Sequence, residues 1–180
     1  MEKCRVWILR LGHRLRRDKR VTTHLLLAAR AFGADRSFYS GQRDEKIERS
    51  VDKVTKSWGG AFEVEYVEDW KKAVKKWKEG AGEVVHLTVY GLPVQDVIGK
   101  LIASPKDKLV LVGGAKVPGA VYELADWNVS VTSQPHSEVS ALSVFLHELF
   151  ERKELSMTFG NAGIRVVPQA KGKKITRTEP

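Results

Sequence analysis

Hydrophobic and polar positions alternate along the chain in two patterns. Short apolar runs, typical of strands buried on both faces, stop at glycine or polar residues; between them, apolar side chains recur every three or four positions, as in amphipathic helices. The strand-like segments are 5–11, 36–39, 62–66, 84–89, 109–112 and 127–131, and the helix-like ones are 22–32, 44–58, a stretch from 69, 93–103, a short run after Pro118, and 139–149. This alternation predicts an α/β domain with a largely parallel sheet and helices on both faces.

Local signals indicate where individual elements begin and end. Thr22 or Thr23 is expected to cap the helix that ends at Gly33. Two short strands, 155–159 and 164–167, flank a glycine-rich turn and predict a C-terminal hairpin, followed by a basic tail that is expected to be mobile. Without a linker or internal repeat, the 180 residues are expected to form one domain.

Composition narrows the kinds of partner. The chain has 31 Lys and Arg against 22 Asp and Glu, a net charge of +9 that favours a polyanion, although RNA, DNA, an anionic membrane surface and a merely lysine-rich surface all stay open. Cys4 is the only cysteine, so we expect no intrachain disulfide and a reducing, cytoplasmic setting. We find no secretory signal and no apolar run long enough to span a membrane, and therefore expect no membrane partner.

A basic loop follows the first strand, at a position where α/β proteins place ligand contacts. Residues 13–20 carry five basic side chains against one acidic side chain. Such a run is commonly only a solvated surface, yet its position also suits contact with phosphate groups. The candidate RNA contacts are Arg16, Arg17 and Lys19.

Several common site chemistries lack their sequence motifs. No GxGxxG opens the first helix, and neither a GxxxxGK(S/T) loop nor a GxSxG elbow is present. The five histidines show no HExxH spacing and no cysteine partners, so no metal site is predicted. Instead, three strand-to-loop junctions, 83–92, 113–118 and 131–138, predict a site for an adenosine-like ligand at the carboxyl ends of strands.

Five segments in combination resemble one family. They are similar to segments of the archaeal tRNA cytidine-56 2'-O-methyltransferases of the SPOUT class. The segments are the LRLGH, RDKR and TTH pieces from Leu9 onward, ARAFGA (29–34), HLTVYG (86–91), GAKVP (114–118) and SQPHSEVSAL (133–142). The resemblance spans about residues 5–174 and implies a C-terminal deep trefoil knot, which no hydrophobic pattern predicts because knots are nearly absent from proteins. It also implies S-adenosyl-L-methionine as cofactor, a homodimer, and methylation of the ribose of cytidine 56 in the T-loop of tRNA.

The resemblance also implies site residues. In related ribose-modifying SPOUT enzymes an arginine stabilises the developing alkoxide, and we assign this role to Arg20, with His24 as a second contact or proton acceptor and Arg14 as the alternative. Ala115 and Thr132 depart from the family pattern, which has an acidic residue and a glycine there. The implied cofactor contacts are Leu87, Gly113, Gly114, Ala115, Lys116, Val117, Val131, Thr132, Ser133, Gln134, Pro135, His136, Ser137 and Glu138.

Two other functions stay open at this point. One is a non-catalytic RNA-binding α/β protein that uses the same basic loop, and the other is a SPOUT enzyme that methylates a base nitrogen. Stabilisation by S-adenosylmethionine distinguishes an enzyme from the first alternative, because a ligand stabilises only a protein that binds it. Nucleoside analysis of methylated tRNA distinguishes the second.

Overall fold

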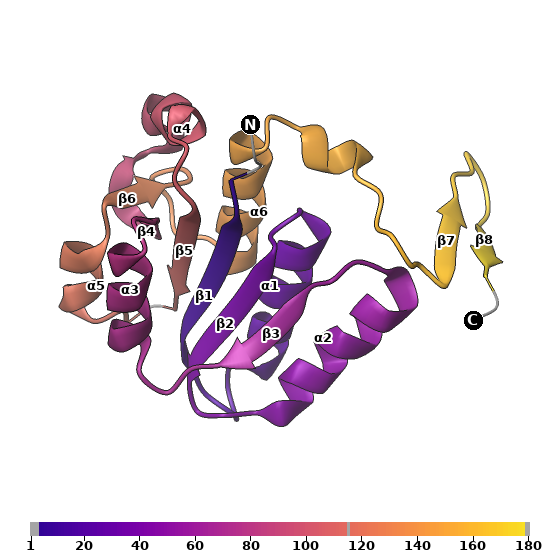
Figure 1. Cartoon of the computed structure of the whole chain (residues 1–180), viewed down its shortest axis with the longest axis horizontal. Coiled ribbons are helices and arrows are strands. Elements are labelled where there is room, and N and C mark those ends of the chain that lie inside the picture. The colour runs from indigo at the N-terminus through magenta and orange to yellow at the C-terminus, as the bar shows by residue number, and fades with distance from the viewer. Residues whose placement is uncertain (1–3, 115, 179–180) are drawn as a thin grey trace.

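Within the residues that the structure describes, six strands form a parallel sheet in the order β3-β2-β1-β5-β4-β6 (Figure 1). The structure is a computed structural model that describes residues 4–114 and 116–178. The strands are β1 (Val6–His13), β2 (Arg36–Gly41), β3 (Glu63–Tyr66), β4 (Glu83–Pro93), β5 (Lys108–Gly113) and β6 (Trp127–Ser130). The parallel sheet expected from the apolar runs is confirmed.

The central strands β1 and β5 are buried on both faces. Ile8 lies opposite Val110 and Leu9 lies opposite Leu111 in the register of the two strands, and all four side chains are buried. The first pair contributes to the core on one face of the sheet and the second pair to the core on the other. A strand covered in this way needs apolar side chains at successive positions, which explains the continuous runs in the sequence.

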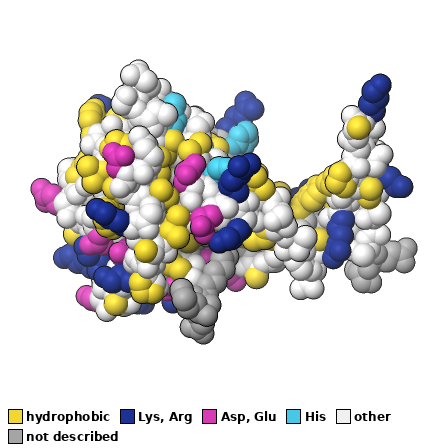
Figure 2. All heavy atoms as spheres, turned by 90° about the horizontal axis from the view of Figure 1, so that it is seen from above, with side chains coloured by type: hydrophobic (Ala, Val, Ile, Leu, Met, Phe, Trp, Pro, Cys, Tyr) yellow, Lys and Arg dark blue, Asp and Glu magenta, His cyan; other side chains and the backbone are white. Residues whose placement is uncertain are grey.

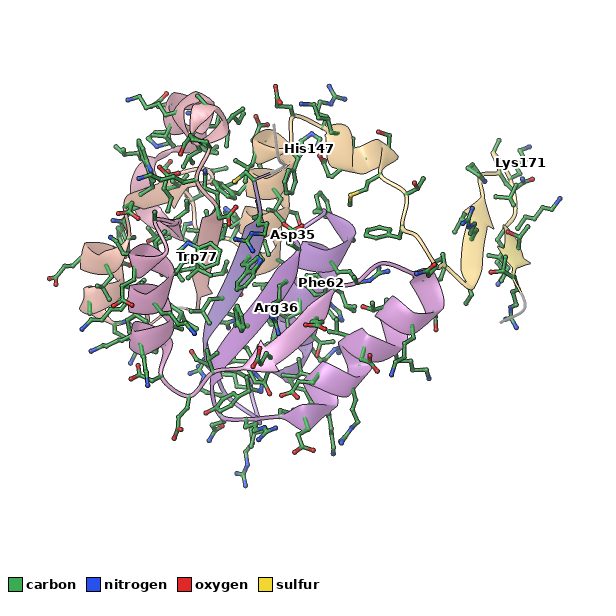
Figure 3. The ribbon with its side chains drawn as sticks, viewed as in Figure 1. Asp35, Arg36, Phe62, Trp77, His147 and Lys171 are labelled. Atoms are coloured by element: carbon green, nitrogen blue, oxygen red, sulfur yellow. The ribbon has the colours of Figure 1, made fainter. Side chains whose placement is uncertain are left out.

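Helices cover both faces of the sheet (Figure 1). One face carries α1 (Lys19–Ala31), α2 (Glu45–Trp58), α4 (Val94–Ala103) and α6 (Glu138–Leu149), and the other carries α3 (Trp70–Glu79) and α5 (Gly119–Leu124). Trp77 of α3 lies against Trp7 of β1 with ring centroids 4.9 Å apart, between the helix and the sheet (Figure 3). No helix in the described part of the chain is long and apolar enough to cross a membrane.

Helix α6 connects distant parts of the sheet. The chain leaves the edge strand β6, passes through the loop 131–137 and enters α6, which packs against α1, α4 and β5. Leu142, Phe145 and Leu146 of α6 are fully buried. The last helix of the main body therefore lies in the same layer as the first, although the strand before it is at the edge of the sheet.

Helix α1 begins earlier than expected, and neither predicted threonine caps it. Its first residue is Lys19 and Asp18 occupies the N-cap position. Thr22 is buried, with its hydroxyl 2.9 Å from Nδ1 of His13, and Thr23 donates to the carbonyl of Lys19. The threonine cap was wrong because Thr22 bonds across to the end of β1, which its local sequence does not reveal.

The C-terminal hairpin has a different partner strand from the one predicted. Residues 155–159 form no strand, and Lys153–Ser156 is a 3-10 helix. Instead β7 (Ile164–Val167) pairs antiparallel with β8 (Lys174–Arg177), in the tail that was expected to be mobile. The basic side chains around Ile175 hide the strand pattern there, because charged residues are uncommon in strands.

Candidate active site

A cleft, called here the first cleft, opens at the carboxyl ends of β4, β5 and β6, where parallel α/β sheets place their ligands. Its volume is about 400 Å³, and small-molecule sites commonly occupy about 300–1,000 Å³. Strand ends, the loop before α6 and the first helical turns of α6 form its walls. The residues around it are His86, Leu87, Thr88, Val89, Tyr90, Val112, Gly113, Gly114, Val117, Tyr122, Val131, Pro135, His136, Glu138 and Ala141.

The end of β4 leaves the regular sheet and forms one wall of this cleft. Its pairing with β6 shifts between Leu87 and Leu92, and Tyr90 in between is 82% exposed. Gly91 passes so close to β6 that a Cβ atom on it would lie 2.4 Å from the backbone nitrogen of Val129. A glycine here therefore lets the chain return to β6 while residues 88–90 line the cleft.

A buried ion pair lies beside the cleft. Arg10 of β1 is 1% exposed, and its Nη2 is 3.6 Å from Oε1 of Glu138, while its Nη1 donates to the carbonyl of Leu11 at 2.5 Å. Burial lowers the pKa of Arg10, and the negative charge of Glu138 opposes that shift. A Cβ on Gly114 would lie 3.3 Å from Glu138 and 3.6 Å from Arg10. Arg10 was not among the site residues expected from the sequence, although a charge inside an apolar strand is a signal for it.

The loop before α6 is held by hydrogen bonds of its own. Nε2 of His136 lies 2.6 Å from the carbonyl oxygen of Val131, and the hydroxyl of Thr132 accepts from the backbone N–H of Gln134 at 3.2 Å. Thr132 has a φ of 62°, in the left-handed region that favours glycine. This backbone conformation accounts for the glycine that the family resemblance implies at this position.

His86 is a buried group in the wall of the cleft. Its Nδ1 bonds Oδ1 of Asn128 at 2.9 Å, and its ring meets that of Tyr122 edge-on with centroids 4.7 Å apart. Burial lowers the pKa of His86, so the neutral ring is favoured. The hydroxyls of Tyr122 and Thr88 lie 3.3 Å apart. These contacts tie the β4 wall to β6 and α5.

A second cleft of about 510 Å³ adjoins the first, since both include Gly114 and Val117. Arg14, Arg17 and Lys116 bring three positive side chains to the second cleft, against one acidic side chain, Glu68. The guanidinium of Arg14 donates to both carboxylate oxygens of Asp18, at 2.8 and 3.2 Å, and these bonds lower the pKa of Asp18. A basic cleft thus lies directly beside a smaller one bounded by strand ends.

Most of the candidate cofactor contacts meet at the first cleft. Of the fourteen residues expected to contact the cofactor, those that line this cleft are Leu87, Gly113, Gly114, Val117, Val131, Pro135, His136 and Glu138. Lys116 lines the second cleft instead. Exposed residues of the loop that line neither cleft are Thr132, Ser133, Gln134 and Ser137. Ala115 lies outside the described residues.

The basic candidates are divided between the second cleft and the open surface. Arg14 and Arg17 line that cleft. Arg16, Lys19, Arg20 and His24 are exposed and line neither cleft. Arg20 forms no ion pair with any other residue that the structure describes. Among residues 4–114 and 116–178, no cluster of His, Cys, Asp or Glu side chains is arranged to hold a metal ion.

Comparison with known proteins gives one consistent result. Residues 58–176 match a family model described as "tRNA ribose 2'-O-methyltransferase, aTrm56". The tRNA (cytidine(56)-2'-O)-methyltransferase of Methanothermobacter thermautotrophicus is 52% identical over 170 residues, which cover 94% of this chain and 95% of that protein. The protein of the same name from Methanopyrus kandleri is 53% identical over 173 residues, which cover 96% of this chain and 97% of that protein.

Solved structures with low sequence identity share the fold. The A. aeolicus TrmH/SpoU tRNA modifying enzyme matches with a TM-score of 0.62 at 13% identity, over 85% of this chain and 77% of that one. The SpoU methyltransferase AviRb from Streptomyces viridochromogenes, in complex with AdoMet, matches with a TM-score of 0.61 at 16% identity, over 87% of this chain and 60% of that one. The fold is therefore that of the SpoU/TrmH class, and the expected α/β sheet with a C-terminal trefoil knot is confirmed.

Replacing Gly91 tests the construction of the cleft wall. Gly91→Ala should destabilise the protein by about 1–3 kcal/mol, because its new methyl group meets the backbone of β6 rather than a movable side chain. The matched control is Gly99→Ala in α4, where a Cβ would meet nothing within 4 Å. This substitution should raise the free energy of unfolding by about 0.5–1 kcal/mol, because alanine has less conformational freedom than glycine to lose on folding. Both are measured by denaturant unfolding. Wild-type stability of Gly91→Ala would contradict the described path of β4.

Proposed function

The chain belongs to the family of the tRNA ribose 2'-O-methyltransferase aTrm56, and from this premise we propose that it methylates the 2'-hydroxyl of cytidine 56 in tRNA, with S-adenosylmethionine as methyl donor. Relatives named for this reaction are 52% and 53% identical to it over nearly its whole length. The structural observation that carries the proposal is the pair of adjoining clefts, one formed by strand ends and one basic, that share Gly114 and Val117.

The first cleft suits S-adenosylmethionine. When bound, this cofactor supplies a methyl group on a positively charged sulfur. Leu87, Val112 and Val131 offer an apolar wall for the adenine ring, and the strand ends around them offer backbone hydrogen-bonding groups. Glu138 lines the cleft with its carboxylate 3.6 Å from the guanidinium of Arg10, so it can accept a hydrogen bond from the cofactor while Arg10 balances its charge. The proposal includes all the residues that the family resemblance implies as cofactor contacts, from Leu87 to Glu138.

The second cleft suits the RNA. Arg14, Arg17 and Lys116 line it, and Arg16 and Lys19 extend the positive charge over the neighbouring surface. Arginine and lysine side chains bind phosphate groups and release condensed counterions from the RNA. Because the two clefts share residues, a ribose placed in the second cleft lies next to a methyl donor placed in the first.

The reaction needs a group that stabilises the 2'-oxygen as its proton leaves. An arginine suits this role because it stays charged and its planar fork can hold a phosphate oxygen and the 2'-oxygen together. Arg14 is already bound through two hydrogen bonds to Asp18, whereas Arg20 has no ion-pair partner among the described residues. We keep Arg20 as the proposed catalytic arginine, with His24, one helical turn further along α1, as its neighbour on the substrate. Because both side chains are exposed and line neither cleft of their own chain, they would act at the clefts of a partner copy.

Two copies of the chain form the working unit in this proposal. Leu142, Phe145 and Leu146 of α6 are buried in the core of their own chain, but Val144 is 42% exposed on the outer side of the helix. Since α1 packs against α6, pairing of two copies through α6 would bring the exposed first turns of α1, with Arg20, close to the partner copy. We place the enzyme in the cytoplasm, where its proposed substrate is found.

The proposed reaction is tested by incubating unmodified tRNA with the enzyme and labelled S-adenosylmethionine. Mass spectrometry of the nucleosides should find 2'-O-methylcytidine, and sequencing of the fragments should locate it at position 56. A methyl group on a base nitrogen would contradict the ribose as target. Absence of transfer together with absence of thermal stabilisation by S-adenosylmethionine would indicate a non-catalytic RNA-binding protein.

Arg20→Ala should lower the rate of methyl transfer in a single turnover by about two to three orders of magnitude, the typical effect of removing one group that stabilises a developing oxyanion. Cofactor affinity should stay at the wild-type value and tRNA affinity should fall only modestly. Arg14→Ala serves as the comparison. Near-normal transfer by Arg20→Ala, together with a large loss in Arg14→Ala, would assign the role to Arg14.

Light scattering should give a mass of about twice 20.2 kDa for the protein in solution. Val144→Glu should shift the mass toward that of one chain, because it places a charge in the proposed contact between copies. Ile102→Glu on α4 is the matched control, since Ile102 is 39% exposed and lies on another helix. A single-chain mass for the wild-type protein would remove the dimer from the proposal.

A further inference from the structure

The hairpin formed by β7 and β8 concentrates positive charge away from both clefts. Residues 164–178 contain no Asp or Glu and five basic side chains, all exposed: Arg165, Lys171, Lys173, Lys174 and Arg177. None of the five forms an ion pair with another described residue. Figure 2 shows Lys and Arg side chains spread over a segment that stands clear of the main body, and Figure 3 shows Lys171 at its tip.

The hairpin is anchored at its base. Gly60 donates to the carbonyl of Gly160 at 2.8 Å, and Gly59 lies so close to this segment that a Cβ would be 2.3 Å from that same oxygen. Arg30 of α1 is buried, bonds the carbonyl of Gly59 at 2.5 Å and covers the ring of Phe159 at 4.7 Å. Contacts from two helices of the main body thus hold the segment that leads into the hairpin.

The free end of the anchored segment closes on itself. The hydroxyl and backbone N–H of Thr178, the residue after β8, donate to the carbonyls of Ala162 and Gly163 at 2.9 and 3.1 Å. The two ends of the hairpin therefore meet at the anchor. Beyond it, the strands extend as a defined arm and not as a loose tail.

The register of the two strands distributes the charge over both faces of the arm. Val167 lies opposite Lys174, and Arg165 lies on the same face two residues away. Val166 and Ile175, opposite each other on the second face, are 61% and 48% exposed, and Arg177 shares that face. A two-stranded hairpin with an uncovered apolar pair is marginally stable alone, so a binding partner would stabilise it.

The charge of the arm indicates the kind of partner that fits it. Five exposed cations without an Asp or Glu among residues 164–178 need negative charge from the partner. A polyanion is attracted by the same five side chains and gains counterion release at each phosphate contact. We propose that the hairpin 164–178 is a second tRNA-binding surface, which contacts the phosphate backbone outside the target nucleotide; the identity of the polyanion rests on the function proposed above.

The test compares two charge-matched variants of the full-length protein. In the first, Arg165→Gln, Lys174→Gln and Arg177→Gln remove three charges from the hairpin. In the control, Lys72→Gln, Lys75→Gln and Lys76→Gln remove three charges from the exposed side of α3, on the opposite face of the sheet from α2 and the hairpin. Measured quantities are tRNA affinity against salt concentration, single-turnover methyl transfer at saturating tRNA, cofactor affinity and the mass by light scattering.

The hairpin variant should bind tRNA more than about tenfold more weakly, and its plot of log affinity against log salt should be shallower by about two to three units, close to one unit for each lost phosphate contact. The α3 variant should change the slope by less than about one unit. Transfer at saturating tRNA, cofactor affinity and melting temperature should match wild type in both. Lys171→Glu at the tip, which leaves the strands untouched, should weaken tRNA binding in the same direction.

Other outcomes would overturn the inference in distinguishable ways. Equal tRNA binding by the hairpin and α3 variants, with an active wild-type enzyme, would reject the hairpin surface and leave the proposed reaction intact. A wild-type protein that neither binds nor methylates tRNA would reject both. A halved mass for the hairpin variant alone would identify the arm as a contact between copies of the chain.

Discussion

The contact between Arg10 and Glu138 constrains the whole arrangement around the clefts. Arg10 is almost completely buried at the carboxyl end of the central strand β1, and a buried guanidinium is costly unless an opposite charge and hydrogen bonds accompany it. Glu138, in the first turn of α6, supplies that charge. The start of α6 must therefore reach the middle of the sheet, although the strand before it, β6, lies at the edge. The loop 131–137 covers this distance and forms a wall of the first cleft as it does so.

The two clefts depend on small residues at the end of β5. Gly113 and Gly114 leave room for Val117 and for the ion pair beside the cleft, since a Cβ on Gly113 would lie 2.3 Å from the Val117 side chain. Gly114 and Val117 then separate a cleft bounded by strand ends from one lined by arginine and lysine. In the proposed reaction a methyl donor and a phosphodiester need different surroundings, the first partly apolar and the second cationic, and this boundary would place both within reach of a single reacting ribose.

The positive charge of the chain has a spatial organisation that its total of +9 does not convey. Part of it lies on α3, on the face of the sheet opposite α1 and α2, and part is neutralised within pairs such as Arg14 with Asp18. The loop after β1 and the C-terminal hairpin carry most of their cations exposed. Net charge alone indicates a class of partner, whereas the positions and pairing of individual side chains determine where that partner can bind.

The six strands of the sheet, most of the helices and the position of the first cleft follow from local patterns in the amino-acid sequence. Buried parallel strands need continuous apolar runs, helices need apolar side chains every three or four positions, and the carboxyl ends of parallel strands meet at one edge of the sheet. Three contacts depend instead on how distant segments pack: Thr22 bonds His13 and does not cap α1, Ile175 belongs to the partner strand of β7, and Arg10 meets Glu138. Local patterns report how a segment folds and which side it buries. Contacts between segments far apart in sequence depend on the path of the whole chain, which leaves no periodic signal in either segment.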